Sequence, residues 1–394
     1  IPFCVKKCDY CDFLSAPADL ETKEKYVEAL INEIKLNKNK MSEYVVDTVF
    51  IGGGTPSLLE ENQISKIMSV LRDNCNMSEN PEITIECNPG TITESKLWEY
   101  KKSGINRISF GLQSANDEEL KSIGIHNYAG FLESYNLARK CGFDNINVDL
   151  MSALPGQTLK SYEETLNKVV RLEPEHISAY SLIVEENTLM YDRVKKAQIK
   201  GINILPDEES ERKMYYLTNN ILRSNGYRKY EISNYSKPGK ECKHNIGYWQ
   251  RKEYLGFGIG AASLYKENRY NNISDINKYI EVLTNNIKEN SINNVGNSSE
   301  VENQVNILNS IVKNLQQLTE RDRMEEFMFL GLRMMEGVSM EKFERYFGKP
   351  YMEVYGKVQK RMEDKRFLIN DNGYVKLTEF GIDLSNYVMS EFLF

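Results

Sequence analysis

Residues 45–56 read VVDTVFIGGGTP, and this stretch decides the fold. Its first seven residues are mainly apolar and β-branched, which predicts a buried strand over 45–51. The three glycines that follow end the strand in a tight turn. A helix is expected next over 61–72, because the apolar residues there recur at helical spacing. A strand, a turn and a helix form the repeating unit of a parallel sheet.

The same unit repeats along the first half of the chain. We expect further strands over 82–87, 107–111, 145–151 and 176–183, and helices over 21–36, 94–103, 130–141 and 159–172. Strands that alternate with helices in this way predict parallel strands joined by crossover helices. Roughly six units favour an α/β fold with a partial (β/α)6 barrel of the TIM type, although a flat doubly wound sheet has nearly the same pattern.

The second half of the chain changes in character. A charged helix is expected near 207–223, and 227–264 mixes glycines, aromatic residues and short apolar runs that indicate irregular structure or a sheet edge. Three helices after a capping signal at Thr319, then a hairpin around Asn372-Gly373, predict a smaller α+β domain with a winged-helix-like end. The chain therefore divides into a barrel core (1–200), a linking region that covers the barrel (201–284), an Asn-rich insertion or loop (285–318) and this C-terminal domain (319–394).

Composition excludes several classes of protein. The net charge of −7, and 12 basic against 14 acidic residues in 320–394, argue against binding to nucleic acid. No run approaches the about 20 apolar residues that cross a bilayer. Four of the seven cysteines are scattered, which indicates small buried residues in a reducing, cytoplasmic compartment rather than a disulfide framework. The chain begins at Ile1 without Met, and we expect the rest of a first strand to precede it.

The other three cysteines lie together in residues 1–13, IPFCVKKCDYCDF. Cys4, Cys8 and Cys11 are soft thiolate donors, which suit an iron–sulfur cluster or zinc. A structural zinc site needs a fourth ligand, and the nearest histidine in sequence is the distant His126. Three ligands fit a four-iron cluster whose remaining iron is open to the amino and carboxyl groups of a small molecule.

Glycine or polar residues also mark the ends of four successive strands. Gly52-Gly53-Gly54-Thr55 follows the first strand, and Glu86, Gln113 and Asp149 end the next three. Glycines let a ligand approach the backbone closely, and the carboxyl ends of barrel strands carry the active site. Each residue alone is also consistent with a tight turn, a solvated acid or a satisfied amide, but their succession favours a ligand site.

The spacing Cys4-x-x-x-Cys8-x-x-Cys11, with Tyr10 before the last cysteine, resembles the cluster motif of radical S-adenosylmethionine (SAM) proteins. The resemblance implies a partial barrel, a [4Fe-4S] cluster on these three cysteines, and reductive cleavage of SAM to methionine and a 5′-deoxyadenosyl radical. It also implies contacts to SAM from Tyr10, Gly53, Gly54, Thr55, Glu86, Gln113, Asp149 and Ala262.

The whole chain resembles the coproporphyrinogen dehydrogenase-like branch of that family, and within it a group of heme chaperones. Asp12-Phe13 stands where the oxygen-independent coproporphyrinogen oxidases have a further cysteine. The stretch HNIGYW (244–249) matches an HNxxYW motif associated with heme, which implies heme contacts from His244, Asn245, Tyr248 and Trp249. An imidazole can ligate heme iron and aromatic rings can pack on a porphyrin, although a histidine paired with a carbonyl and a Tyr-Trp pair in the core fit the same letters.

The sequence departs from the family pattern on the SAM side. Family members usually have G-R-x-H where this chain has Gly124-Ile125-His126, so an Arg that contacts SAM is absent. Ala262 stands where a His is usual, and Ala153 where a Gly is usual. These differences concern SAM more than the cluster ligands.

The resemblance implies a heme chaperone without oxidase activity, which carries the cluster and SAM and inserts heme into acceptor proteins of respiration. One alternative is a radical enzyme acting on a tetrapyrrole, such as an oxygen-independent coproporphyrinogen III dehydrogenase or a heme-modifying enzyme. Another is a regulatory scaffold that uses the C-terminal domain. The cluster implies a flavodoxin or ferredoxin as electron donor, and we further expect peripheral membrane contact through the acceptors and a homodimer.

Overall fold

A curled seven-stranded sheet forms the centre of the protein. The computed structural model describes residues 1–292 and 297–394, apart from the side chains of 285–303. The sheet has the order β1-β2-β3-β4-β5-β7-β6, and β1 to β5 pair in parallel. Its strands are β1 (Val45–Ile51), β2 (Asn76–Cys87), β3 (Arg107–Gln113), β4 (Ile146–Ser152), β5 (His176–Ser181), β6 (Arg228–Lys229) and β7 (Asn234–Ser236).

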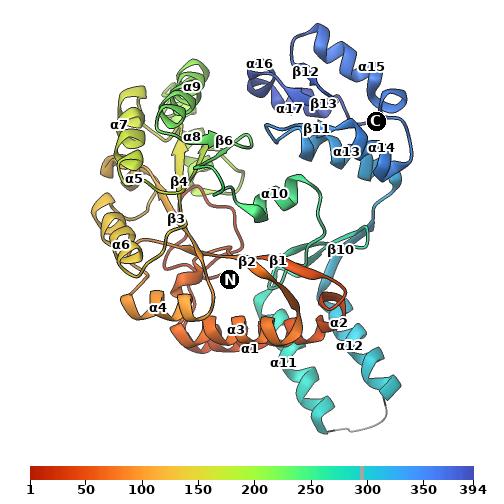
Figure 1. Cartoon of the computed structure of the whole chain (residues 1–394). Helices are drawn as coiled ribbons and strands as arrows, with labels where there is room; N and C mark the ends of the chain where they lie inside the picture. Colours follow the sequence, from red (N-terminus) through yellow and green to blue (C-terminus); the bar gives the residue numbers. More distant parts are fainter. Residues whose placement is uncertain (293–296) are drawn as a thin grey trace.

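Helices cover the outer side of this sheet (Figure 1). The strand–helix alternation confirms the predicted partial barrel. The helices are α1 (Leu20–Leu36), α2 (Lys38–Met41), α3 (Glu61–Asn74), α4 (Glu94–Lys102), α5 (Asp117–Ser122), α6 (Tyr128–Lys140), α7 (Leu159–Val170), α8 (Leu189–Ile199) and α9 (Glu208–Ser224), with a short 3-10 turn η1 (Pro56–Leu58) after β1.

The sixth position of the barrel differs from the six parallel units predicted. β7 lies next to β5 and runs antiparallel to it, and β6 pairs only with β7. β6 and β7 are consecutive arms of one hairpin, so only one of them can run in the direction of β5. The hairpin therefore places the antiparallel strand β7 beside β5, and β6 forms the edge of the sheet.

Alternation along each strand gives the barrel a polar interior. On β3, the fully buried Phe110 packs edge-on against Phe131 of α6, with ring centroids 6.0 Å apart. The next residues along the strand point the other way, and Ser109 reaches Asp149 of β4 inside the barrel. Because side chains alternate with a period of two, the apolar residues face the helices and the polar ones face inward.

The Asn-rich range, expected as an insertion or loop, forms regular structure where it is described. α11 (Ile276–Ile292) packs on α1, and α12 (Asn297–Ile311) leads into β10 (Val312–Gln317). β10 completes a three-stranded sheet with β8 (Ala262–Tyr265) and β9 (Asn268–Asn272). Ile307, Leu308 and Ile311 are buried on one face of α12, which explains why this polar sequence folds. Residues 293–296 of the predicted loop lie outside the described residues.

The C-terminal domain has the element order of a winged helix. Thr319 and Asp322 form a capping box at the start of its first helix, as predicted. The domain has its own core, centred on Phe343, Tyr351 and Tyr355. Its elements are α13 (Glu320–Gly331), β11 (Val338–Ser339), α14 (Met340–Phe347), α15 (Tyr351–Asp364), β12 (Leu368–Asp371), β13 (Tyr374–Leu377), α16 (Glu379–Asp383) and α17 (Ser385–Ser390).

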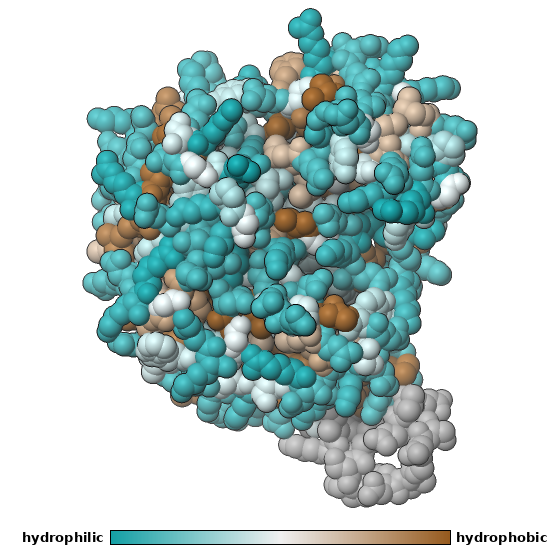
Figure 2. Space-filling view, viewed as in Figure 1, coloured by the Kyte–Doolittle hydropathy of each residue, from teal (hydrophilic) through white to brown (hydrophobic). Residues whose placement is uncertain are grey.

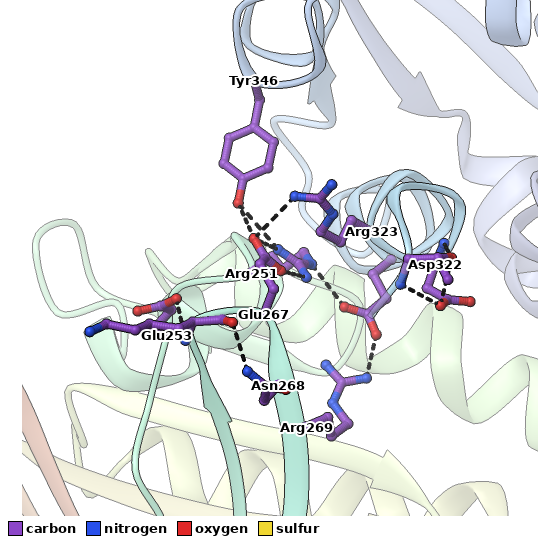
Figure 3. Close-up of polar contacts among 11 residues, drawn as sticks. Arg251, Glu253, Glu267, Asn268, Arg269, Asp322, Arg323 and Tyr346 are labelled. Carbon is purple, nitrogen blue, oxygen red and sulfur yellow. Dashed lines mark hydrogen bonds and ion pairs between the residues drawn. The ribbon is translucent and has the colours of Figure 1, made fainter. Parts of the chain in front are cut away.

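An ionic cluster fastens this domain to the linking region (Figure 3). Arg251 donates from Nε to Glu326 of α13 at 2.8 Å and pairs with Glu267 between β8 and β9. Arg269 of β9 pairs with the other oxygen of Glu326. The Tyr346 hydroxyl of α14 donates to Glu267 at 2.8 Å. Arg251 is only 4% exposed, so the ion pairs hold the two parts together away from water.

The face shown in Figure 2 is mainly hydrophilic. On the face in Figure 2, apolar residues form separate small patches between polar ones. Among the described helices, none is long and apolar enough to cross a membrane.

Candidate cluster and cofactor site

The N-terminal loop lies directly on the glycine turn after β1. The backbone nitrogens of Gly54 and Thr55 donate to the carbonyls of Ile1 and Phe3, at 2.8 and 2.7 Å. The loop closes on itself where the Cys4 nitrogen donates to the Ala16 carbonyl at 3.2 Å. The turn at the end of β1 thus fixes the loop that carries the three cysteines.

This packing explains a glycine in the turn more directly than ligand access does. A Cβ added at Gly54 would lie 2.7 Å from the Phe3 carbonyl oxygen and 3.0 Å from the Ser15 side chain. Gly53 has φ +113°, a conformation that L side chains rarely adopt. The glycines are therefore needed to bring the cysteine loop onto the sheet.

The three cysteine thiols lie near one another at the mouth of the barrel. All three are partly buried and unbonded to other cysteines. Burial raises the pKa of Cys8 to about 11, with further contributions from Cys11 and Cys4. Burial likewise raises the pKa of Cys11. The Cys4 sulfur lies 3.5 Å from the Thr55 hydroxyl oxygen.

This donor set fits an iron–sulfur cluster. Within the described residues, no three His, Cys, Asp or Glu side chains converge as a single zinc ion would need. Three thiols spaced along one loop can each bind a different iron of a [4Fe-4S] cluster, which stabilises them as thiolates. When bound, such a cluster supplies the electron that cleaves SAM.

Two carboxylates lie near each other beside the cysteine loop: Glu86 close to the end of β2, and Asp149 in the middle of β4. Glu86 accepts a hydrogen bond from the Gly53 nitrogen at 3.0 Å. Loss of hydration and the nearby Asp149 raise the pKa of Glu86 to about 7. Loss of hydration also raises the pKa of Asp149, which is opposed mainly by a 2.7 Å bond from Asn147. A cationic amino group placed between them would relieve both effects.

Gln113 and Tyr10 complete this end of the barrel. Gln113 has φ +70° and accepts a hydrogen bond from the Tyr180 hydroxyl at 3.1 Å. Tyr10 lies near groups of the cysteine loop and of the strands. Burial raises its pKa well above the ordinary value, and Cys8, Tyr180, Cys11 and Asp149 contribute. The structure thus brings together the predicted Tyr10, Gly53, Thr55, Glu86, Gln113 and Asp149.

Sequence reasoning missed two residues of this group. Tyr180 lies at the carboxyl end of β5, where the rule that found Glu86 and Asp149 applies equally. Asn88, two residues after Glu86, donates from Nδ2 to the Thr55 hydroxyl at 2.9 Å. Both could have been found from their position at a strand end.

The HNxxYW motif forms the short helix α10 (Lys243–Trp249), which lies against β1. The His244 ring stacks on Phe50, with centroids 5.1 Å apart. Its Nδ1 lies 2.8 Å from the Thr48 hydroxyl and its Nε2 3.1 Å from the Tyr248 hydroxyl. Burial lowers the pKa of His244 to about 4, so the imidazole is neutral at pH 7.

A glutamate that sequence reasoning missed holds the start of α10. Glu82 of β2 accepts hydrogen bonds from the backbone nitrogens of Lys243 and His244, both at 3.0 Å. A carboxylate at a helix N-terminus satisfies free N–H groups and complements the helix dipole. Glu82 and Lys243 are far apart in sequence, so no local signal links them.

His244 and Tyr248 open into a cavity of about 1410 Å³ between β1, α10 and the segment leading into β8. Gly53 and Gly54 of the turn, Phe13 of the cysteine loop and Ala262 also line it. The predicted SAM contact Ala262 therefore lines the same cavity as His244 and Tyr248. A cavity of this size exceeds the about 300–1,000 Å³ of typical ligand pockets.

Trp249 and Asn245 do not line this cavity. The guanidinium carbon of Arg333 lies 4.4 Å from the centroid of the Trp249 ring, and the ring packs near Met334. His244 and Tyr248 are four residues apart and share one face of α10, whereas Trp249 is turned away from them. The motif thus has one face toward the cavity and another toward the C-terminal domain.

Comparison with protein-family models identifies the class. Residues 1–169 match the model of the radical SAM superfamily, and residues 318–384 match that of the HemN C-terminal domain. The solved structure "Coproporphyrinogen III oxidase (HemN) from Escherichia coli is a Radical SAM enzyme" has the same fold, with a TM-score of 0.81 over 100% of this chain and 88% of that one, at 22% identity. Fold and cysteine loop together define a radical SAM protein.

Curated relatives narrow the class to one family. "Heme chaperone HemW" of Bacillus subtilis is 35% identical over 100% of this chain and 97% of its own length. The protein of the same name from Lactococcus lactis is 34% identical over 100% and 96%. The Escherichia coli protein of that name is 37% identical over 66% and 68%. The chain belongs to the HemW family.

Proposed function

We propose that the protein is a heme chaperone, which binds heme in the cavity beside His244 and transfers it to acceptor proteins. The single observation that carries this proposal is the position of His244, whose neutral ring lies at the wall of a 1410 Å³ cavity. The name of the relatives of matching length supports the same function.

The surroundings of His244 suit a ligand for heme iron. The Thr48 hydroxyl oxygen can accept a hydrogen bond from the protonated Nδ1 of His244, which leaves a lone pair on Nε2. The Tyr248 hydroxyl donates a hydrogen bond to that lone pair. Heme binding would replace this hydrogen bond by a bond from Nε2 to iron. Tyr44, Tyr254 and Tyr265 also line the cavity and offer aromatic surface to a porphyrin. Lys243 and Lys252 line it as well and can pair with heme propionates.

We place the binding sites of the cluster and SAM at the mouth of the barrel. Cys4, Cys8 and Cys11 hold the cluster, while Glu86 and Asp149 offer carboxylates to the amino group of SAM. We assign the heme acceptors to respiration, the electron donor to the flavodoxin or ferredoxin class, and the location to the cytoplasm. We also propose a homodimer that reaches the membrane only through its acceptors.

A radical enzyme acting on a tetrapyrrole is the second candidate. One observation favours it: the paired carboxylates Glu86 and Asp149 and the three cysteines stand together, as SAM cleavage would require. Phe13 counts against a coproporphyrinogen dehydrogenase, because it stands where those enzymes have a further cysteine and its side chain lines the cavity.

The test uses anaerobically reconstituted protein that holds its cluster. Heme is titrated into the wild type, His244→Ala and His126→Ala, and the Soret band gives the affinity. We expect His244→Ala to bind heme at least about tenfold more weakly, and His126→Ala, which alters a histidine outside the cavity, to bind as the wild type does. Equal affinity in all three removes His244 as a ligand.

The same samples separate chaperone from enzyme. Reduced protein with SAM is assayed for 5′-deoxyadenosine in the presence of heme or of coproporphyrinogen III. Heme binding without substrate-dependent 5′-deoxyadenosine supports the chaperone. Catalytic release together with a changed porphyrin supports the enzyme.

A further inference from the structure

A continuous chain of hydrogen bonds crosses the inside of the barrel. It starts at the carboxylate of Asp149, which accepts from Asn147 Nδ2 at 2.7 Å. Asn147 Oδ1 lies 2.6 Å from His176 Nδ1, and His176 Nε2 lies 2.8 Å from the Tyr230 hydroxyl. The Tyr230 oxygen accepts from the backbone nitrogen of Cys242 at 3.4 Å. The chain thus links the carboxylate of β4 to the residue that precedes α10.

The chemistry of these groups gives the chain one direction. A backbone N–H can only donate, so Cys242 donates to Tyr230. An amide oxygen can only accept, so His176 donates from Nδ1 to Asn147. A neutral histidine then has a lone pair on Nε2, to which Tyr230 donates its proton. Every donor therefore points from α10 toward Asp149.

Burial keeps this direction fixed. Asn147, His176 and Cys242 are at most 2% exposed, and Tyr230 is 9% exposed. Burial lowers the pKa of His176 well below its ordinary value, which keeps the ring neutral. Reversing one bond in such a chain leaves a buried donor or acceptor without a partner, so the members shift together.

The far end of the chain sets the position of the HNxxYW helix. Cys242 is the N-cap residue of α10, and its sulfur lies 3.4 Å from Glu82, which also holds the first N–H groups of the helix. Tyr230 and Trp249 belong to one apolar cluster with Cys242. Tyr230 is therefore bonded to the backbone at the start of the helix that carries His244.

We propose that His176 and Tyr230 are positioning residues that couple the occupant of Asp149 to the heme helix α10, so that SAM and heme change each other's affinity. The inference rests on the proposed function for the identity of the two ligands. A ligand that bonds to Asp149 competes with Asn147 for that carboxylate, and the shift reaches Cys242 through two side chains that touch neither ligand. Coupling of this kind is reciprocal between the two sites.

The experiment measures heme affinity with and without SAM on cluster-reconstituted protein. The variant is Tyr230→Phe, which keeps the ring and removes the hydroxyl that joins His176 to Cys242. The control is Tyr162→Phe, which removes another buried tyrosine hydroxyl, bonded to Thr218 at 2.9 Å and outside the chain. We expect SAM to change heme affinity about fivefold or more in the wild type and the control, and less than about twofold in Tyr230→Phe. Equal coupling in all three proteins, or none in the wild type, overturns the proposal.

A second readout needs no heme and so separates this inference from the proposed function. Amide hydrogen exchange over 243–249 is compared with and without SAM. SAM is expected to change exchange in α10 of the wild type and of Tyr162→Phe, but not of Tyr230→Phe. If the wild type fails to bind heme yet shows this pattern, the chaperone function and the effect on heme affinity both fail, while the link between Asp149 and α10 stands. If SAM leaves α10 exchange unchanged in the wild type, the coupling itself is refuted.

Discussion

Replacing Arg251 by Met is expected to loosen the C-terminal domain from the rest of the protein. The change keeps most of the aliphatic volume and removes the cation shared by Glu267 and Glu326. Glu326, 6% exposed, would keep only Arg269 as an ionic partner. Glu267 would keep the Tyr346 hydroxyl and a more distant Arg323 at 3.8 Å.

The magnitude follows from burial. Removing one partner of a buried ion pair costs about 3–5 kcal/mol, because the remaining charge stays away from water. Arg269 still neutralises part of the charge on Glu326, which places the expected loss near the lower end, at roughly 3 kcal/mol. Arg321→Met is the control: its pair joins an exposed Arg to a partly buried Glu325 one helical turn away, and the loss of such a pair near the surface costs no more than about 1 kcal/mol.

Trp249 provides the assay, because its ring lies against Arg333 of the C-terminal domain. The only other tryptophan is Trp98 of α4, so urea unfolding is followed by fluorescence in a Trp98→Phe background. The Trp249 transition should move to markedly lower urea in Arg251→Met and remain nearly unchanged in Arg321→Met. Equal midpoints in the two variants would refute the reasoning that the ionic cluster holds the domain.

Three further predictions concern the glycine turn after β1 and the helix α10, which packs on that strand. Gly54→Ala should lower the iron content after reconstitution and reduce the free energy of unfolding by about 1–3 kcal/mol, because the new Cβ overlaps the Phe3 carbonyl. The control Gly130→Ala in α6 should retain full iron, and normal iron in Gly54→Ala would contradict the packing argument. Tyr248→Phe should bind heme about fivefold more tightly in a Soret titration, because a competing hydrogen bond worth roughly 1 kcal/mol is lost; weaker binding would assign Tyr248 a direct role instead. Heme affinity should be constant from neutral pH down to about 5 and fall as the pH drops through about 4, where His244 gains its proton; a midpoint near 6.5, the ordinary value, would mean that the ring is not buried.

Local patterns predicted the strands and the cysteine loop well. The predicted strand over 45–51 agrees with β1 residue for residue, because apolar periodicity is a property of the segment itself. β2 begins at Asn76, earlier than the predicted 82, since its first half is polar and is held by pairing with Val45 and Val46 of β1. Such pairing depends on a distant strand and leaves no local pattern.

The surroundings of α10 could not be predicted from the motif. The letters HNIGYW identified His244, but its partners Thr48 and Glu82 come from strands far back in the chain. The orientation of Trp249 could have been predicted from the sequence. His244 and Tyr248 are four residues apart and share a face of the helix, whereas Trp249, five residues after His244, does not lie on that face. The chain through His176 was hidden for a different reason: a buried histidine carries no sequence mark of its partners.

Strand β1 contacts both the helix that carries His244 and the glycine turn that holds the cysteine loop, and this has an evolutionary consequence. Phe50 stacks on His244, and it also crowds the turn, where a Cβ at Gly52 would lie 2.9 Å from its ring. A mutation at Phe50 is therefore exposed to selection at two sites at once. Tyr265 also lines the cavity, but its ring packs on Tyr44 rather than on His244. Lineages that adapt to a new porphyrin are expected to diverge first at positions such as Tyr265, while β1 changes slowly.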